Sequence, residues 1–183
     1  MGNADRCEQL EGASAGHAAF DSVMDEKGFD DLIADELHRR VGRRTPVASG
    51  TVVTTGAGEL AGSHGVRRII HVASVVGEPG AGFRQVRNLA ACVANVLAEA
   101  DRLATADPTL RVILMPLLGI GDGGGDLSAT VITMVDTAVS FLADHPRTRL
   151  DEIRLLGFNT EEWRALTTTM TGHPQLVHDD RPV

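Results

Sequence analysis

Apolar residues follow two different periods from residue 66 onward. Short, nearly continuous apolar runs are typical of buried strands, and they predict strands over 66–76, 110–118 and 152–158. Between these runs, apolar residues recur at intervals of three and four, which predicts amphipathic helices. The predicted helices cover 84–106, 128–143 and 160–170, with Ser128 as the N-cap of the second and with Trp163 and Leu166 of the third facing inward.

The first 65 residues carry a weaker pattern. Residues 17–26 and 29–41 favour helices, and Thr51–Thr55 has the composition of a strand. Residues 1–16 and 171–183 are polar, and no internal repeat divides the chain. Because domains contain roughly 100–200 residues, we expect one domain over 1–170 and a polar C-terminal tail over 171–183.

Alternating strands and helices predict an α/β fold with a parallel sheet. Parallel neighbours need a long crossover connection, and such crossovers are right-handed. Ligands of these sheets bind beyond the carboxyl ends of the strands. The segments 76–83, 118–127 and 157–161 follow three predicted strands, so we expect them to converge on one binding edge.

Charge and composition exclude several classes of function. The chain has 17 Lys and Arg against 25 Asp and Glu, a formal net charge of −8, with Lys27 as its single lysine. Sequence-independent nucleic-acid binding needs many cations, and single-strand binding needs aromatic platforms, of which this chain has few. No secretory signal, no run of about 18 apolar residues and no cysteine framework around Cys7 or Cys92 is visible, which favours a cytoplasmic protein without a membrane partner.

A glycine-rich stretch begins at Gly119. Four of the five residues 121–125 are glycines, and the fifth is Asp122. This stretch follows a predicted strand and precedes a predicted helix. Glycines there let the backbone approach a ligand and present its N–H groups, and the helix N-terminus adds partial positive charge. The stretch lacks the Gly-Lys-Ser/Thr of NTP-hydrolysing loops. Its G-x-G-x-x-G match is weak, because Phe158 and Asn159 end the next strand where a dinucleotide fold needs an acid.

The segment MPLLGIGDGGGDLSATVITMVDTAVSFL resembles the phosphate-binding loop and helix of macrodomains, which bind ADP-ribose. The upstream GTVVTTGAGEL and VRRIIHVASV are similar to the strands that precede this loop in the family, so the resemblance covers about residues 47–165. It implies a three-layer α/β/α sandwich with a mostly parallel or mixed central sheet. The strands that the family places before Asn3 are absent, so we expect an N-terminal part that is incomplete relative to the family.

Site residues follow from this resemblance. The glycine stretch would wrap the diphosphate and distal ribose, Phe158 would contact the adenine with Asn159 beside it, and Val76 and Gly77 would line the adenine side. A core position is the alternative for Phe158 and for the valine, and His71 is interpreted as a buried structural histidine. Asn3 resembles a remnant of the family's asparagine loop, and Asp30 takes the place of the hydrolases' aspartate, although an ordinary helix-opening acid is the alternative. The implied ligand-binding set is Asn3, Val76, Gly77, Gly119, Ile120, Gly121, Asp122, Gly123, Gly124, Gly125, Phe158 and Asn159, with Asp30 as the catalytic candidate.

Three functions stay open. The first is a module that binds ADP-ribose or a related nucleotide diphosphate, and the second is a hydrolase that removes ADP-ribose from modified macromolecules or small esters. The third is a degenerate domain that serves as a protein-interaction surface. No metal and no cofactor is implied, because no metal-spaced cluster and no Ser/His/Asp or Cys/His set is legible. Partners would be an ADP-ribosylated protein or nucleic acid, and a second copy or a partner segment that completes the sheet.

Overall fold

The computed structural model describes residues 35–39, 42, 47–78 and 80–177. The chain divides into two compact units, one of Met1–Pro46 with Val53–Ile69 and one of Val47–Val52 with Ile70–Val183. Of the predicted N-terminal helices, 17–26 lies outside the described residues. Residues 35–39 of the predicted helix 29–41 are described, and they are helical.

The smaller unit holds most of the first strand pair. β1 (Val52–Gly56) is joined to β2 (Arg68–Val72) through the short helix α3 (Leu60–Ser63), and the two strands pair in a two-stranded sheet. β1 confirms the strand predicted at Thr51–Thr55, displaced by one residue. Its β-branched side chains suit a pleated, half-buried surface, and Val53 in its middle is buried.

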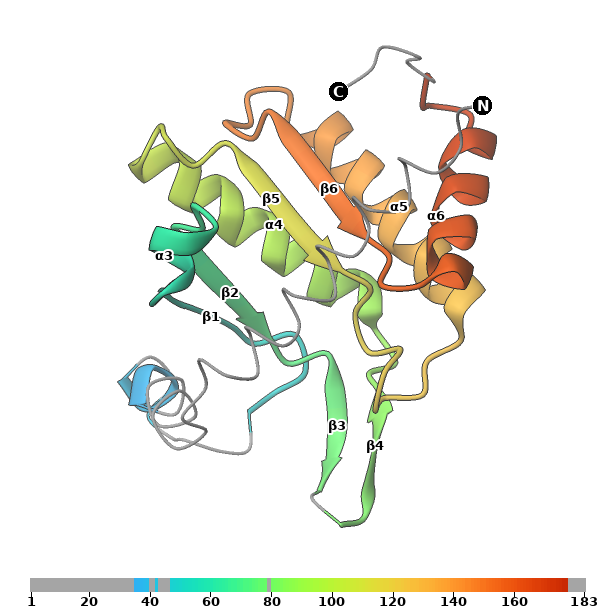
Figure 1. Ribbon diagram of the computed structural model, residues 1–183, viewed down its shortest axis with the longest axis horizontal. Coiled ribbons are helices and arrows are strands. Elements are labelled where there is room, and N and C mark those ends of the chain that lie inside the picture. The colour runs from blue at the N-terminus through green and yellow to red at the C-terminus, as the bar shows by residue number, and fades with distance from the viewer. Residues whose placement is uncertain (1–34, 40–41, 43–46, 79, 178–183) are drawn as a thin grey trace, which may run out of the picture. The chain divides into compact units, whose positions relative to one another are not determined.

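The larger unit contains the predicted parallel crossover. β5 (Val112–Pro116) pairs in parallel with β6 (Glu152–Leu156), in a register that sets Val112 opposite Glu152 and Pro116 opposite Leu156. The connection between them contains helix α5 (Leu127–Asp144), while α4 (Leu89–Ala106) precedes β5 and α6 (Thr160–Gly172) follows β6. In Figure 1, α4 and α5 lie behind the β5–β6 pair. The α/β fold expected from the periodicity is confirmed.

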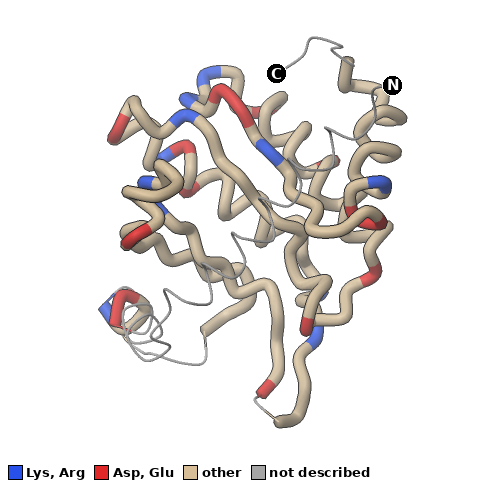
Figure 2. Tube along the Cα trace, in the orientation of Figure 1, with Lys and Arg blue, Asp and Glu red and all other residues tan. Residues whose placement is uncertain are grey.

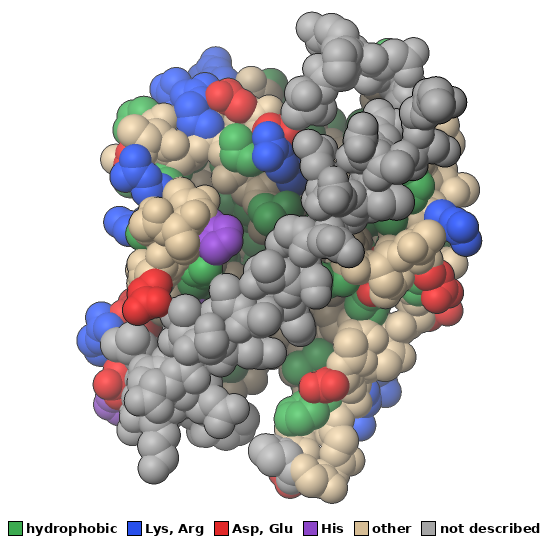
Figure 3. All heavy atoms as spheres, in the orientation of Figure 1, with side chains coloured by type: hydrophobic (Ala, Val, Ile, Leu, Met, Phe, Trp, Pro, Cys, Tyr) green, Lys and Arg blue, Asp and Glu red, His purple; other side chains and the backbone are tan. Residues whose placement is uncertain are grey.

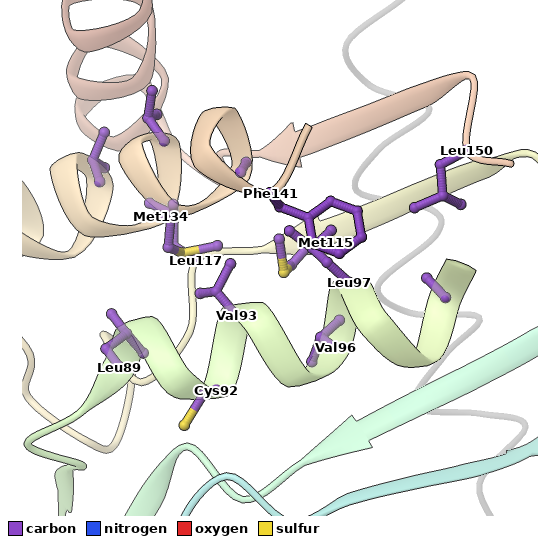
Figure 4. Packing of buried hydrophobic residues seen from close by; sticks show 14 of the residues in the cluster. Leu89, Cys92, Val93, Val96, Leu97, Met115, Leu117, Met134, Phe141 and Leu150 are labelled. Atoms are coloured by element: carbon purple, nitrogen blue, oxygen red, sulfur yellow. The ribbon is translucent and has the colours of Figure 1, made fainter. Parts of the chain in front are cut away.

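A single apolar cluster fills the space between these helices and strands. Figure 4 shows side chains of α4 meeting those of α5 and of β5. Val93, Leu97, Val131 and Met134 are completely buried, as the spacing of apolar residues on the two helices predicts. The α5 helix is, among the described residues, the one helix long and apolar enough to cross a bilayer. Its apolar face packs into this cluster instead.

The secondary structure predicted from the sequence is wrong between residues 66 and 88. The single strand predicted over 66–76 is two strands, because the chain breaks at Ala73 and Ser74 between β2 and β3 (Val75–Glu78). β3 then turns back into β4 (Gly82–Gln85) as an antiparallel hairpin, where the segment 76–83 was expected to be a loop. The helix predicted from residue 84 therefore begins at Leu89, where the Asn88 side chain accepts a hydrogen bond from the N–H of Ala91 at 3.1 Å.

Two details of the later helices also differ from prediction. The N-cap of α5 is Asp126, whose carboxylate accepts from the N–H of Ala129 at 2.7 Å, so the assignment of Ser128 is wrong. Asp126 combines a cap with a negative charge at the positive end of the helix. In α6, Leu166 is buried as predicted, but Trp163 is 60% exposed and does not face inward. The helix ends at Gly172, within the segment predicted as a tail.

Candidate functional site

The segment Gly119–Gly125, here called the glycine loop, is a compact turn between β5 and α5. The N–H of Gly125 donates to the carbonyl of Gly119 at 3.1 Å, and the N–H of Gly124 donates to that of Gly121 at 3.0 Å. At its start, the N–H of Leu118 donates to the sulfur of Met134 at 3.4 Å. The loop therefore has a defined conformation and is joined to the first turns of α5.

Three glycines of the loop are packed so closely that a side chain has no room. A Cβ at Gly123 would lie 2.5 Å from the carbonyl oxygen of Gly119, and one at Gly125 would lie 2.5 Å from Nε2 of Gln85. Gly119 has φ +73, and its Cβ would lie 2.8 Å from Cγ of Gln85. Gly123 is therefore required by its contact with backbone and Gly119 by its positive φ, whereas a Cβ at Gly125 would displace only the end of the Gln85 side chain.

The opposite side of the loop is open. A Cβ at Gly121 or Gly124 would meet no atom within 4 Å, and Gly121, Asp122 and Gly124 are exposed. Within the part of the chain that the structure describes, the N–H groups of residues 119–123 donate to no protein group. Several adjacent backbone donors thus lie on a turn in which Gly121 and Asp122 are exposed and Gly123 is buried, directly before the N-terminus of an 18-residue helix. This arrangement suits an anion.

The β3–β4 hairpin supports the loop from one side. The N–H of Gln85, at the end of β4, donates to the carbonyl of Gly123 at 2.7 Å, and a Cβ at Gly123 would also contact the Val75 side chain. Val76 is half-buried and packs against the core cluster, which is the alternative considered for it. Gly77 is exposed, with φ +154, and a Cβ there would collide with the carbonyl oxygen of Gly82 across the hairpin. Its glycine is therefore explained by strand pairing.

Phe158 and Asn159 follow the end of β6. Because Pro116 is opposite Leu156 in the parallel pair, the glycine loop and Phe158 leave the sheet at the same edge. The convergence expected for 118–127 and 157–161 is confirmed at the level of the backbone. The Phe158 side chain is 68% exposed, so the core interpretation of this residue is wrong.

Asn159 is the N-cap of α6 and forms a reciprocal pair with Glu162. Its Oδ1 accepts from the N–H of Glu162 at 2.9 Å, and its Nδ2 donates to Oε1 of Glu162 at 2.6 Å. The other carboxylate oxygen of Glu162 accepts from the N–H of Phe158 at 2.8 Å. Glu162 is buried, and it fixes the backbone at the end of β6. Sequence reasoning missed Glu162, although the spacing Asn-x-x-Glu before a helix is a capping signal.

The catalytic candidate Asp30 and the proposed loop remnant Asn3 lie outside the described residues. His71 is half-buried on β2, and burial lowers its pKa, which keeps the ring neutral near pH 7. Its interpretation as a structural histidine agrees with this environment. Among the described residues, no three His, Cys, Asp or Glu side chains gather closely enough to hold a metal ion.

A hollow of about 460 Å³ lies at the C-terminal end of α5. It is lined by Asp101, Asp144, His145, Pro146, Arg147 and Thr148. The Asp101 carboxylate already accepts from Oγ1 of Thr148 at 2.6 Å and from the N–H of Arg149 at 2.7 Å, and these bonds lower its pKa. The acid thus anchors the turn before β6.

Charges of both signs are mixed along the larger unit, where Figure 2 shows Arg interspersed with Asp and Glu. Arg84 stands next to Gln85 on β4. The loop itself carries one charged side chain, the exposed Asp122. Within the loop itself, affinity for an anion would therefore come from backbone N–H groups and the helix N-terminus.

The parallel pair, the crossover helix and the loop at the carboxyl edge define an α/β domain of the macrodomain type. Residues 26–134 match the model of the Macro domain, and the chain belongs to this family. A search of curated proteins found no match.

Solved structures confirm the fold. The Oceanobacillus iheyensis macrodomain with ADP is 17% identical, with a TM-score of 0.55 over 75% of this chain and 65% of that one. A glycine-to-valine mutant of the same macrodomain with ADPR is 17% identical, with a TM-score of 0.55 over 79% of this chain and 75% of that one. An aspartate-to-alanine mutant is 19% identical, with a TM-score of 0.55 over 74% and 65%. The chain thus spans about two thirds of the ADP complex's length.

The packing of the loop predicts opposite responses to adding one methyl group. We expect Gly123→Ala to lower the free energy of unfolding by about 1–3 kcal/mol, because the new Cβ collides with backbone. Gly121→Ala, with open space around the new Cβ, should change it by less than about 0.5 kcal/mol. Urea denaturation of both variants measures the difference. Equal stabilities would contradict the inward packing of Gly123.

Proposed function

We propose that this chain binds ADP-ribose or a related nucleotide diphosphate at the glycine loop. The observation that carries the proposal is a run of adjacent backbone N–H groups at residues 119–123 that donate to no group among the described residues, on a turn whose Gly121 and Asp122 are exposed in front of the α5 N-terminus. Membership of the Macro domain family supports it, as does the likeness of the fold to a macrodomain with ADP and to one with ADPR.

The diphosphate would accept hydrogen bonds from the loop amides on the open side, at Gly121 and its neighbours. Backbone donors have the advantage that they are already ordered, so little conformational entropy is lost on binding. Asp122 would repel a phosphate but can accept hydrogen bonds from ribose hydroxyls. Its exposed carboxylate therefore favours a sugar beside the diphosphate over inorganic diphosphate alone.

The adenine would contact Phe158, whose exposed ring stands past the same edge of the sheet as the loop. An exposed aromatic face offers stacking worth about 1–3 kcal/mol per base. Val76 would contribute a half-buried apolar wall. Asn159 would act through the backbone of Phe158, because both polar atoms of its side chain are already bonded to Glu162.

Titration of the purified chain with ADP-ribose tests the binding proposal. We expect heat release in calorimetry and a rise of the melting temperature that grows with ligand concentration. Gly121→Glu should abolish both without loss of the cooperative fold, because its side chain enters open space and places a carboxylate at the diphosphate. Gly121→Ala is the matched control and should retain binding. No response of the folded wild-type chain to millimolar ADP-ribose would refute the proposal.

We propose that hydrolysis of ADP-ribosyl groups is slow or undetectable. The segment before Asp30 reads Asp25-Glu26-Lys27-Gly28, with bulky charged side chains where the family's hydrolases have a glycine-rich approach. Two extra carboxylates would repel the phosphates, and a displacement of about 1 Å can reduce a rate about a hundredfold. Asp30 is the candidate for residual activity.

Release of ADP-ribose from a modified protein measures this activity directly. We expect equal, negligible turnover for the wild-type chain and for Asp30→Ala, with unchanged affinity for free ADP-ribose. Robust turnover that disappears in Asp30→Ala would overturn the preference for a binding module and establish a hydrolase.

The partner would be an ADP-ribosylated protein or nucleic acid, and we place this encounter in the cytoplasm. The described cysteine, Cys92, is a free buried thiol, which supports a reducing compartment.

We further propose that a second copy or a partner segment covers the outer face of β5, where Val112 and Leu114 are 50% and 58% exposed. Figure 3 shows hydrophobic side chains on this face of the molecule.

Sedimentation velocity of the purified chain tests the covering of this face. We expect self-association that weakens in Leu114→Ser, because the substitution removes exposed apolar surface. Ile132→Ser, on the exposed side of α5, is the control and should leave the association unchanged. A stable wild-type monomer at all accessible concentrations would contradict self-association.

A further inference from the structure

Gln85 is a polar residue outside the predicted site whose contacts all converge on the glycine loop. Its side-chain Nε2 donates two hydrogen bonds, one to the carbonyl of Leu118 at 2.8 Å and one to Oγ1 of Thr130 at 2.8 Å. Its backbone N–H donates to the carbonyl of Gly123 at 2.7 Å. One residue of β4 thus binds the residue before the loop, Gly123 within the loop and the first turn of α5.

The side chain of Gln85 also fills the space behind the loop. It occupies the positions where Cβ atoms of Gly119 and Gly125 would lie, so the backbone at both ends of the loop rests directly on it. Gln85 is half-buried, and Thr130 is 1% exposed. Hydrogen bonds in such a partly desolvated position are costly to leave unmade, which favours a single arrangement of the loop.

The direction of these bonds separates two sides of the loop. Gln85 donates hydrogen bonds to the carbonyl oxygens of Leu118 and Gly123. The N–H groups of residues 119–123 donate to no group within the described part of the chain. The C=O and N–H of one trans peptide point in opposite directions, so the bond to Leu118 turns the N–H of Gly119 away from Gln85. The N–H that belongs to the Gly123 carbonyl is that of Gly124, which donates to the carbonyl of Gly121 within the loop. A flip of the Leu118–Gly119 peptide would present an oxygen in place of the Gly119 donor.

We propose that Gln85 is a positioning residue that fixes the glycine loop in a single arrangement, with the Gly119 N–H turned away from Gln85, ready for the nucleotide diphosphate. This inference rests on the proposed function for its effect on affinity, but its effect on the free loop is independent of any ligand. Gln85 does not touch the ligand; it acts through the backbone of Leu118 and Gly123.

Gln85→Met is the direct test, because methionine has a similar length and fills the space while it removes both side-chain donor contacts. We expect a folded chain whose loop spends only a minor part of its time in the competent arrangement. If that fraction falls to about a tenth, the dissociation constant for ADP-ribose rises about tenfold. In ¹⁵N relaxation of the unliganded chain, the amides of 119–125 should become more mobile while those of α4 stay unchanged.

Thr130→Val is a second variant, which removes the hydroxyl and keeps the shape of the side chain. We expect a smaller change in the same direction, and a non-additive effect when it is combined with Gln85→Met, because the two residues share one hydrogen bond. Thr137→Val is the matched control on the same helix. Its hydroxyl donates to the carbonyl of Thr133 at 2.6 Å and is not bonded to the loop.

The two measurements separate the possible failures. Increased loop mobility together with weakened binding in Gln85→Met, compared with the wild-type chain, supports the proposal. Unchanged mobility, or unchanged affinity in a chain whose wild type binds, overturns it. If the wild-type chain binds no ADP-ribose, the proposed function fails, and the mobility of the free loop alone decides whether Gln85 holds it.

Discussion

The glycine loop can rest on the β3–β4 hairpin because three of its residues have no Cβ. Any side chain at Gly123 would meet the carbonyl of Gly119, and side chains at Gly119 or Gly125 would meet Gln85. This close contact brings backbone carbonyls within reach of the hairpin, while the amides of 119–123 donate to no group among the described residues. The position of the loop at the carboxyl edge of β5 then follows from the parallel pairing of β5 with β6.

A chain with a net charge of −8 has to hold an anionic ligand by local means. At separations beyond about 10 Å, salt at 0.1 M largely screens the repulsion between surface carboxylates and a ligand. At contact distance, oriented N–H groups and the end of a helix dominate. A glycine-rich turn before an 18-residue helix provides both without a single lysine. The same local character leaves room for an acidic side chain, Asp122, beside the amides.

The strongly periodic part of the chain could be predicted from its sequence, since α5, α6, β5 and β6 are found within two residues of the predicted bounds, and α4 ends as predicted although it begins five residues later. Local geometry set by single contacts could not. Gln85 was assigned to a helix, because the turn of the β3–β4 hairpin breaks the pattern and the apolar run 66–76 hides the break at Ser74. Glycines alone also cannot reveal which of them face protein and which face solvent; that distinction depends on Gln85 and Val75. The capping role of Asn159 is legible in sequence, although a resemblance directed attention to ligand contact instead.

The central claim is that backbone amides of residues 119–123 hold the diphosphate. Amide chemical shifts recorded during a titration with ADP-ribose, and separately with ADP and with AMP, test it most directly. The account predicts that the largest perturbations fall on Gly119–Gly125 and the first turn of α5 for ADP-ribose and ADP, and that they are weaker for AMP, which lacks the second phosphate. Perturbations centred on the hollow at Asp101 and His145, with the glycine loop unmoved, would contradict it.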